Sequence, residues 1–430
     1  MKHRDKTEDE KNKIKGRNNR NEDLDDDFET ESVEFVDKDD DYYNDEVDEI
    51  KVYSNARELR RKKKKVRRRR IIELILFVVL AILLWLNWNV LAPPQLADAV
   101  DSLTIGIGNS KYPVSYDQGT LKTAVPMGSN VGILTDTSFL IYSQTGEQLA
   151  ERPHGFNDPC AVSGGGNVVI FDRGGLQFRV ENIFGEPFSE TASNDITTAA
   201  VGASGSFAIV TQSQDYLSEL TVYDSSDKNI FEWNCVQGRI LCASISPDGK
   251  KLAAIVVGAR DGSIFSDVYI FNLNSQTPSI KKFDGEMLFS IGFKDNNNIA
   301  AVGEDKTVFL TSDGVQTADY EYGSKQLVCS SNEDSSVILV FGDVDDQSSV
   351  VSLDESGKLQ GKTSVSGKVN DVSTGGGNIV LVSNGQIWYT SVACTGIKKI
   401  NVTGYVLAAL PIKQFAYVFG TQSIGRYNMD

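Results

Sequence analysis

The chain has 430 residues and a formal net charge of −16. Two histidines exclude a zinc site built from several histidines, and the sparse use of cysteine, five in all, suggests a protein that does not rely on disulfides. Acidic and basic side chains occupy separate blocks, so the net charge alone does not identify a partner.

Residues 1–59 are expected to form a disordered, charged cytoplasmic tail. Residues 21–50 hold sixteen acidic side chains and one basic side chain, too polar a composition to offset the entropy of folding. Apolar residues such as Phe35 and Tyr42 are interleaved with the carboxylates. This pattern suits either docking of a basic cytoplasmic partner or a solvated tail without a partner.

Residues 60–70 form a basic juxtamembrane segment, and residues 71–91 are predicted to be a transmembrane helix. Ten of the eleven residues in the first segment are Lys or Arg, and the second is almost wholly apolar. At a rise of about 1.5 Å per residue, this length crosses a bilayer core. The basic run predicts a cytoplasmic N-terminus, attraction to anionic lipid and an extracytoplasmic domain after the span. No aromatic residue interrupts it, which argues against nucleic-acid binding.

A cleaved signal peptide is the alternative for this region. Ala97-Asp98-Ala99 has the small-x-small form of a cleavage site. However, the apolar run is longer than the usual signal core, and a long tail precedes it. An uncleaved signal anchor, giving a single-pass protein of the cell membrane, is therefore the better interpretation.

Residues 92–430 are predicted to be an all-β extracytoplasmic domain. Eight times, a short apolar strand, a polar turn and a second apolar strand follow one another, as in CASISPDGKKLAAIVV. The second strands recur at intervals of 36 to 47 residues; they begin at Val131, Val168, Phe207, Leu252, Ile299, Val337, Ile379 and Phe415. This interval is typical of a four-stranded propeller blade. We therefore expect a β-propeller of eight blades, or of seven if one repeat is miscounted.

A family resemblance supports this interpretation. SPDGKKLAAIVV followed by DVYIFNLNS resembles WD40-like and quinoprotein-type repeats. The basic run, single span and eight repeats together resemble an uncharacterised family of membrane-anchored bacterial β-propellers. The resemblance covers residues 92–430 and implies a fold without implying an activity. Quinone chemistry is not expected, because Trp233 and Trp388 do not belong to a repeated docking motif.

The ends of the domain predict how the ring closes. The eighth repeat has three strands and ends in SIGRYN, one strand short of a blade. An upstream apolar segment, either 103–107 or 112–116, could supply the missing outer strand. Such pairing would leave no long unprotected sheet edge.

Catalytic and metal-binding residue types are sparse in this domain. His154, with Asp158 nearby, lies in a predicted loop between blades and could serve catalysis only as a lone histidine. Cys160, Cys242 and Cys329 recur on innermost strands and suit buried packing, whereas Cys235 and Cys242 could form a disulfide. No nucleophile motif is present, and no cofactor is expected.

One face of the propeller is predicted to carry a recognition surface. Turns between second and third strands emerge on the same face as the connections between blades. Carboxylates and aromatic residues are expected there in blades three, four and six: Asp215, Tyr216, Asp261, Phe265, Asp267, Asp343, Asp345 and Asp346. Such oxygens suit a hard cation such as Ca²⁺, although no segment has the spacing of an EF-hand loop.

These features predict a non-enzymatic binding, scaffold or sensing protein of the bacterial cell envelope. Its expected partner is an envelope protein or polymer. The alternative is an envelope hydrolase or lyase that uses carboxylates on the acidic face, which would need a pair of them at a set separation.

Overall fold

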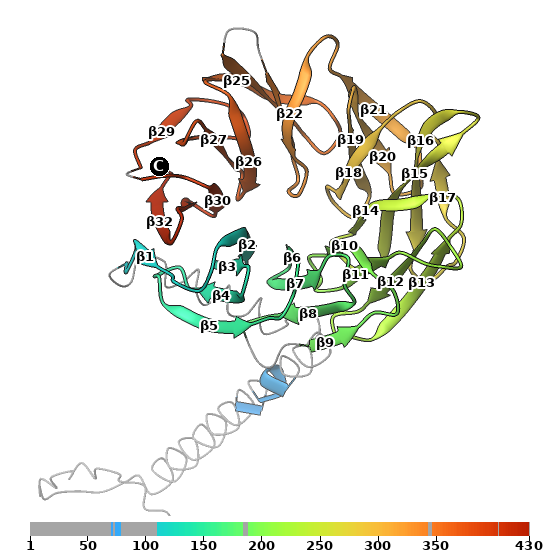
Figure 1. Ribbon diagram of the computed structural model, residues 1–430, viewed down its shortest axis with the longest axis horizontal. Coiled ribbons are helices and arrows are strands. Elements are labelled where there is room, and N and C mark those ends of the chain that lie inside the picture. The colour runs from blue at the N-terminus through green and yellow to red at the C-terminus, as the bar shows by residue number, and fades with distance from the viewer. Residues whose placement is uncertain are drawn as a thin grey trace, which may run out of the picture. The chain divides into compact units, whose positions relative to one another are not determined.

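The computed structural model describes residues 70–71, 74–78, 110–183, 188–342, 346–402 and 404–429, and its strands form a ring of eight blades (Figure 1). Each blade is an antiparallel sheet of four strands. The predicted β-propeller with eight blades is therefore confirmed, and the alternative of seven is wrong.

Blades one to four follow one another along the chain, each running from its inner to its outer strand. Blade one is β2 (Leu121–Met127), β3 (Asn130–Thr135), β4 (Ser138–Tyr142) and β5 (Gln148–Pro153). Blade two is β6 (Pro159–Gly164), β7 (Asn167–Asp172), β8 (Gln177–Glu181) and β9 (Phe188–Thr191). Blade three is β10 (Ile196–Val201), β11 (Phe207–Thr211), β12 (Ser218–Tyr223) and β13 (Asn229–Cys235). Blade four is β14 (Arg239–Ile245), β15 (Lys251–Arg260), β16 (Ser263–Asn272) and β17 (Ser279–Lys281).

Blades five to seven repeat this order, and blade eight completes the ring. Blade five is β18 (Leu288–Phe293), β19 (Asn298–Gly303), β20 (Lys306–Thr311) and β21 (Gln316–Glu321). Blade six is β22 (Gln326–Ser331), β23 (Val337–Gly342), β24 (Gln347–Leu353) and β25 (Leu359–Ser366). Blade seven is β26 (Val369–Gly375), β27 (Asn378–Ser383), β28 (Gln386–Ser391) and β29 (Lys398–Ile400). Blade eight is β30 (Ala408–Ile412), β31 (Phe415–Phe419), β32 (Ser423–Asn428) and β1 (Val114–Ser115).

The central part of the second strand of each blade is apolar because both of its faces are buried. In β15, alternate side chains point to opposite sides of the sheet. Leu252 and Val256 pack toward blade three, whereas Ala253 and Ile255 pack toward blade five. Outer strands face solvent on one side and alternate instead, as β21 does. Each of eight apolar clusters accordingly lies between two neighbouring blades.

The ring is closed by the upstream segment 112–116. β1 pairs antiparallel with β32, through Val114 opposite Ile424 and Ser115 opposite Ser423. The Tyr112 hydroxyl donates to the Ser143 carbonyl at 2.9 Å, and its ring contacts Tyr417 edge-on at 5.6 Å between centroids. The predicted closure is confirmed with this segment, while residues 103–107 lie outside the described residues.

The N-terminal unit is described only in part. Residues 70–71 and 74–78 are helical. Within the described ranges, no helix combines the length and the apolar character needed to cross a membrane. The tail 1–59, nearly all of the basic segment 60–70, most of the span 71–91 and the Ala97–Ala99 cleavage motif lie outside the described residues.

Candidate functional site

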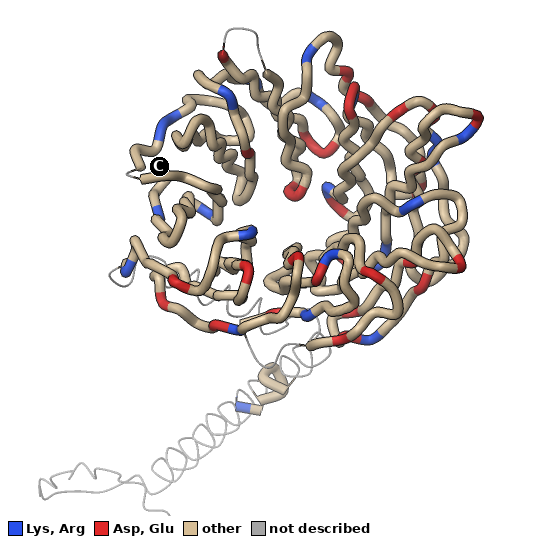
Figure 2. Tube along the Cα trace, viewed as in Figure 1, with Lys and Arg blue, Asp and Glu red and all other residues tan. Residues whose placement is uncertain are grey.

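The turns between second and third strands and the connections between blades lie at the same end of the strands, because the strands of each blade alternate in direction. We call this surface the connection face. Acidic residues outnumber basic ones in its described turns, and Figure 2 shows acidic positions in most of the blades. The acidic residues are Asp117, Asp136, Asp158, Asp195, Asp215, Asp261, Asp284, Glu286, Glu304, Asp305 and Asp346; the basic ones are Arg173, Lys282, Lys325 and Lys368.

Four of the predicted site residues are exposed in turns of this face. Asp215 and Tyr216 lie between β11 and β12, and the backbone N–H groups of both donate to the Ser213 hydroxyl. Asp261 occupies the β15–β16 turn with a φ of 52°, followed by Gly262 with a φ of 81°. Both angles are positive, as a tight hairpin turn of type I′ requires. Asp346 is exposed before β24, whereas Asp343 and Asp345 lie outside the described residues.

Two predicted surface residues are buried, so that part of the prediction is wrong. Asp267 is 0% exposed and Phe265 is 4% exposed, both on β16. Asp267 Oδ2 lies 2.6 Å from the guanidinium of Arg260, and its Oδ1 accepts from the Phe283 N–H at 3.3 Å. Arg260 also pairs with Asp284 and lies over the Phe265 ring at 4.2 Å. β15 and β16 continue past the position at which the corresponding strands of other blades turn. Phe265 and Asp267, which were expected in a loop, therefore lie on β16, where Asp267 links the hairpin to the connection between blades four and five.

His154 and Asp158 lie in the connection between blades one and two, as predicted. The His154 ring nitrogen Nε2 is 3.0 Å from the Thr135 carbonyl, and the ring stacks on Phe156. Burial lowers the pKa of His154 below its ordinary value, so the ring is neutral near pH 7. Asp158 pairs with Arg173 at 2.7 Å. Both side chains therefore have local structural partners.

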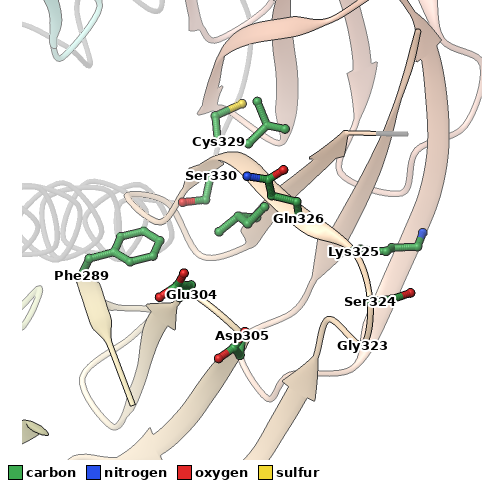
Figure 3. A pocket seen from close by; sticks show the side chains of 11 residues that line it. Phe289, Glu304, Asp305, Gly323, Ser324, Lys325, Gln326, Cys329 and Ser330 are labelled. Atoms are coloured by element: carbon green, nitrogen blue, oxygen red, sulfur yellow. The ribbon is translucent and has the colours of Figure 1, made fainter. Parts of the chain in front are cut away.

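The structure adds a hollow that sequence reasoning missed. It has a volume of about 470 Å³ and lies between blades five and six, lined by Phe289, Glu304, Asp305 and residues 323–330 (Figure 3). Glu304 and Asp305 form the turn between β19 and β20. Asp215 and Asp261 were selected because they are carboxylates in predicted turns between second and third strands. The GEDK segment meets the same criterion, so it could have indicated this hollow. Residues 323–330 could not be assigned to the same site from the sequence, because only the folded ring brings them beside this turn.

A buried lysine lies on the opposite face. Lys294 is 7% exposed, and its Nζ donates to the carbonyls of Asn332 at 2.9 Å and Asp334 at 2.7 Å. Burial lowers the pKa of Lys294 to about 7, although Asp334 and Glu333 act in the other direction. Desolvation by the surrounding protein raises the pKa of the nearby Glu333. These contacts join the turns of blades five and six.

Metal and thiol chemistry gain no geometric support in the described chain. Across its residues, no three His, Cys, Asp or Glu side chains gather in a way that could hold a metal ion. The five cysteines are free thiols, so Cys235 and Cys242 do not form a disulfide. Cys160, Cys242 and Cys329 lie on the first strands of blades two, four and six, where burial raises the pKa of each thiol.

Comparison with known proteins identifies a family and a fold. A family model described as "Family of unknown function (DUF5711)" matches residues 109–423. No curated protein matches the chain. The C-terminal WD40 domain of Sif2 is similar in structure, with a TM-score of 0.53 and 12% identity over 75% of this chain and 100% of that one. A eukaryotic initiation factor has a TM-score of 0.50 and 14% identity over 76% of this chain and 89% of that one. At these identities the likeness concerns the fold alone.

Proposed function

The chain belongs to the DUF5711 family of unknown function, and from this premise we propose that it is a membrane-anchored, non-enzymatic binding, scaffold or sensing protein of the bacterial cell envelope. A closed propeller presents many variable turns on a rigid ring, which suits recognition of another molecule. In this proposal the propeller lies outside the cell, and the N-terminal tail lies in the cytoplasm.

Anchoring is supported by the order of charge and hydropathy along the sequence. The basic segment 60–70 directly precedes the apolar segment 71–91, an arrangement that retains the basic side in the cytoplasm. The same segment would attract anionic lipid. The acidic tail is available for a basic cytoplasmic partner, and nucleic acid is not a proposed ligand.

The observation that carries the binding proposal is the set of exposed carboxylates on the connection face. Asp215, Asp261 and Asp346 come from three different blades, and none of them has an ion pair within the described chain. Unpaired charges of one sign favour association with a partner of opposite charge and increase its rate of encounter. The proposed partner is a basic or cation-bridged protein or polymer of the envelope.

The test uses the full chain in detergent, immobilised and incubated with solubilised envelope material. The variant Asp215→Asn, Asp261→Asn, Asp346→Asn should capture several-fold less of its partners than the wild type. The matched control is Glu147→Gln, Asp313→Asn, Glu355→Gln, which removes three exposed carboxylates from turns on the opposite face. Both variants should fold, because surface changes are usually within about 0.5 kcal/mol.

Two outcomes would redirect the proposal. Unchanged capture by the connection-face variant would move the site to the opposite face or to the tail. Turnover of an envelope polymer by the pure protein, lost in that variant, would show that the hydrolase or lyase alternative is correct.

A further inference from the structure

The first strands of the blades carry a repeated irregularity near the connection face. In blades one, three, four, five, six and seven, the pairing with the second strand shifts by one residue close to the start of the first strand. The extra residues are Lys122, Thr197, Leu241, Phe289, Val328 and Asn370. Such a β-bulge leaves one residue without a pairing partner and redirects its side chain.

In three consecutive blades the redirected side chain is apolar and exposed. Leu241 in blade four, Phe289 in blade five and Val328 in blade six are 37%, 39% and 37% exposed. We call these three residues the bulge arc. The equivalent residues of blades one and seven, Lys122 and Asn370, are polar, as expected for side chains that meet only water. Apolar side chains at the same structural position in neighbouring blades therefore form one continuous sector of the ring.

The hollow between blades five and six lies within this sector. Phe289 and Val328 line it together with Glu304 and Asp305 (Figure 3). Both carboxylates are exposed, and neither has an ion pair or side-chain hydrogen bond among the described residues. The nearby cation, Lys325, donates to the Ser349 hydroxyl at 3.3 Å and lies 5.7 Å from the centre of the Phe341 ring. The two carboxylates outnumber Lys325 among the residues that line the hollow, so net negative charge remains beside the apolar side chains of Phe289 and Val328.

We propose that the bulge arc, with Glu304 and Asp305, binds a polypeptide segment in which an aromatic or aliphatic anchor is flanked by Lys or Arg. The inference rests on the proposed function and narrows its site to blades four to six. A hollow of about 470 Å³ is large enough for such an anchor. The carboxylates would pair with the flanking cations, and they would repel nucleic acid or an anionic lipid surface.

The test measures binding of labelled peptides to the full chain in detergent by fluorescence anisotropy. The probe is a library of short peptides with a central Phe, Trp or Leu between Lys and Arg residues. Two matched libraries replace the anchor by Ala or the basic residues by Glu. The first library should contain peptides that bind. Both replacements should lower the affinity of these peptides at least about tenfold, since buried aromatic anchors and close charge pairs dominate such interfaces.

Variants of the chain then locate the site. Phe289→Ser should weaken binding about tenfold or more. Glu304→Gln with Asp305→Asn should weaken it several-fold and reduce its dependence on salt. Leu359→Ser is the matched control, because Leu359 is 59% exposed on the outer strand β25 of blade six. That variant should bind as the wild type does.

Several results would overturn the inference. These are a library without any binder, equal binding by the Ala-anchor peptides, or equal binding by Phe289→Ser. A dimer that is lost in Phe289→Ser, without peptide binding, would assign the bulge arc to a second copy of the chain. Envelope capture that depends on Asp215, Asp261 and Asp346 but not on Phe289 would leave the proposed function standing while this inference fails.

Discussion

At the residue scale, two aspartates of one hairpin show how far environment outweighs sequence position. Asp261 and Asp267 both belong to the segment GARDGSIFSD, and both were predicted to lie on the binding surface. Asp261 is exposed in the turn, whereas Asp267 is fully buried against Arg260 and the Phe283 N–H. A carboxylate in the first setting can serve recognition, and one in the second serves stability.

Replacing Asp267 should therefore destabilise the fold. Asp267→Ala leaves the buried N–H of Phe283 without its acceptor, which should lower the free energy of unfolding by about 1–3 kcal/mol. Asp261→Ala is the control and should change it by less than about 0.5 kcal/mol. Urea unfolding followed by circular dichroism measures both, and equal stability of the two variants would contradict the assigned roles.

The buried Lys294 should make stability depend on pH. Its pKa is about 7 in the folded state, below the value of 10.5 for a free lysine, so the unfolded chain binds more protons between these values. The contribution of Lys294 to the free energy of unfolding should therefore be least favourable below pH 7 and should improve as the pH rises toward 10. Burial also raises the pKa of the neighbouring Glu333, and the positive charge of Lys294 acts in the opposite direction.

This dependence is measured as the difference in Tm between the wild type and Lys294→Met. The Met variant lacks the titrating group, so the wild type should gain several degrees relative to it between pH 7 and pH 10. A difference in Tm that is constant across this range would show that the ammonium is not desolvated in the folded state.

At the element scale, tight turns allow neighbouring blades to approach each other closely. Gly165, in the β6–β7 turn, has a φ of 57°, and a Cβ at this position would overlap the backbone carbonyl of Ala203 in blade three. Gly174, in the β7–β8 turn, has a φ of 77° but open space around it. Gly165 is required because the neighbouring blade lies against it, whereas Gly174 is required only by the positive φ of its own turn.

A pair of alanine substitutions separates these two requirements. Gly174→Ala should cost about 1–2 kcal/mol from the left-handed backbone alone. Gly165→Ala should cost about 1–3 kcal/mol more, because the blades must separate to accommodate the methyl group. Denaturant unfolding gives the free energy of unfolding of both variants. Equal losses in the two variants would mean that blades two and three separate without a free-energy penalty.

The short strand β1 should contribute far more to stability than its two residues suggest. Without it, the edge of β32 is unpaired and the contacts of Tyr112 with Ser143 and Tyr417 are lost. A chain that starts at Asp117 should therefore melt several degrees below one that starts at Ser110. Identical melting temperatures in scanning calorimetry would show that the ring does not depend on this closure.

At the scale of the whole molecule, the ring replaces one central core by eight seams between blades. Each seam combines side chains from two neighbouring sheets, so each blade depends on both of its neighbours. The same geometry brings Phe289 of β18, Glu304 of the β19–β20 turn and Val328 of β22 to one hollow. A candidate site of this kind arises from the seam and belongs to no single repeat.

The proposed topology has a direct test in intact cells. External protease should cleave the domain after residue 92 and leave the tail 1–59 protected, because the basic segment 60–70 would hold the tail inside. Permeabilised cells are the control, in which both parts become accessible. Cleavage of the tail in intact cells, with the propeller protected, would reverse the proposed orientation.

The sequence by itself determined the repeat and therefore the architecture. Second strands beginning at Val131, Leu252 and Phe415 were predicted from their apolar runs, which persist because both faces of these strands are buried. The three-stranded last repeat likewise predicted closure by an upstream segment, either 103–107 or 112–116, and the structure pairs β1, from the second of these segments, with β32. Only the tertiary structure decided which polar and apolar side chains are exposed to solvent. Burial of Asp267, exposure of Phe289 at a bulge and the hollow beside Glu304 depend on strand length, register and the neighbouring blade, which the local pattern of one repeat does not contain.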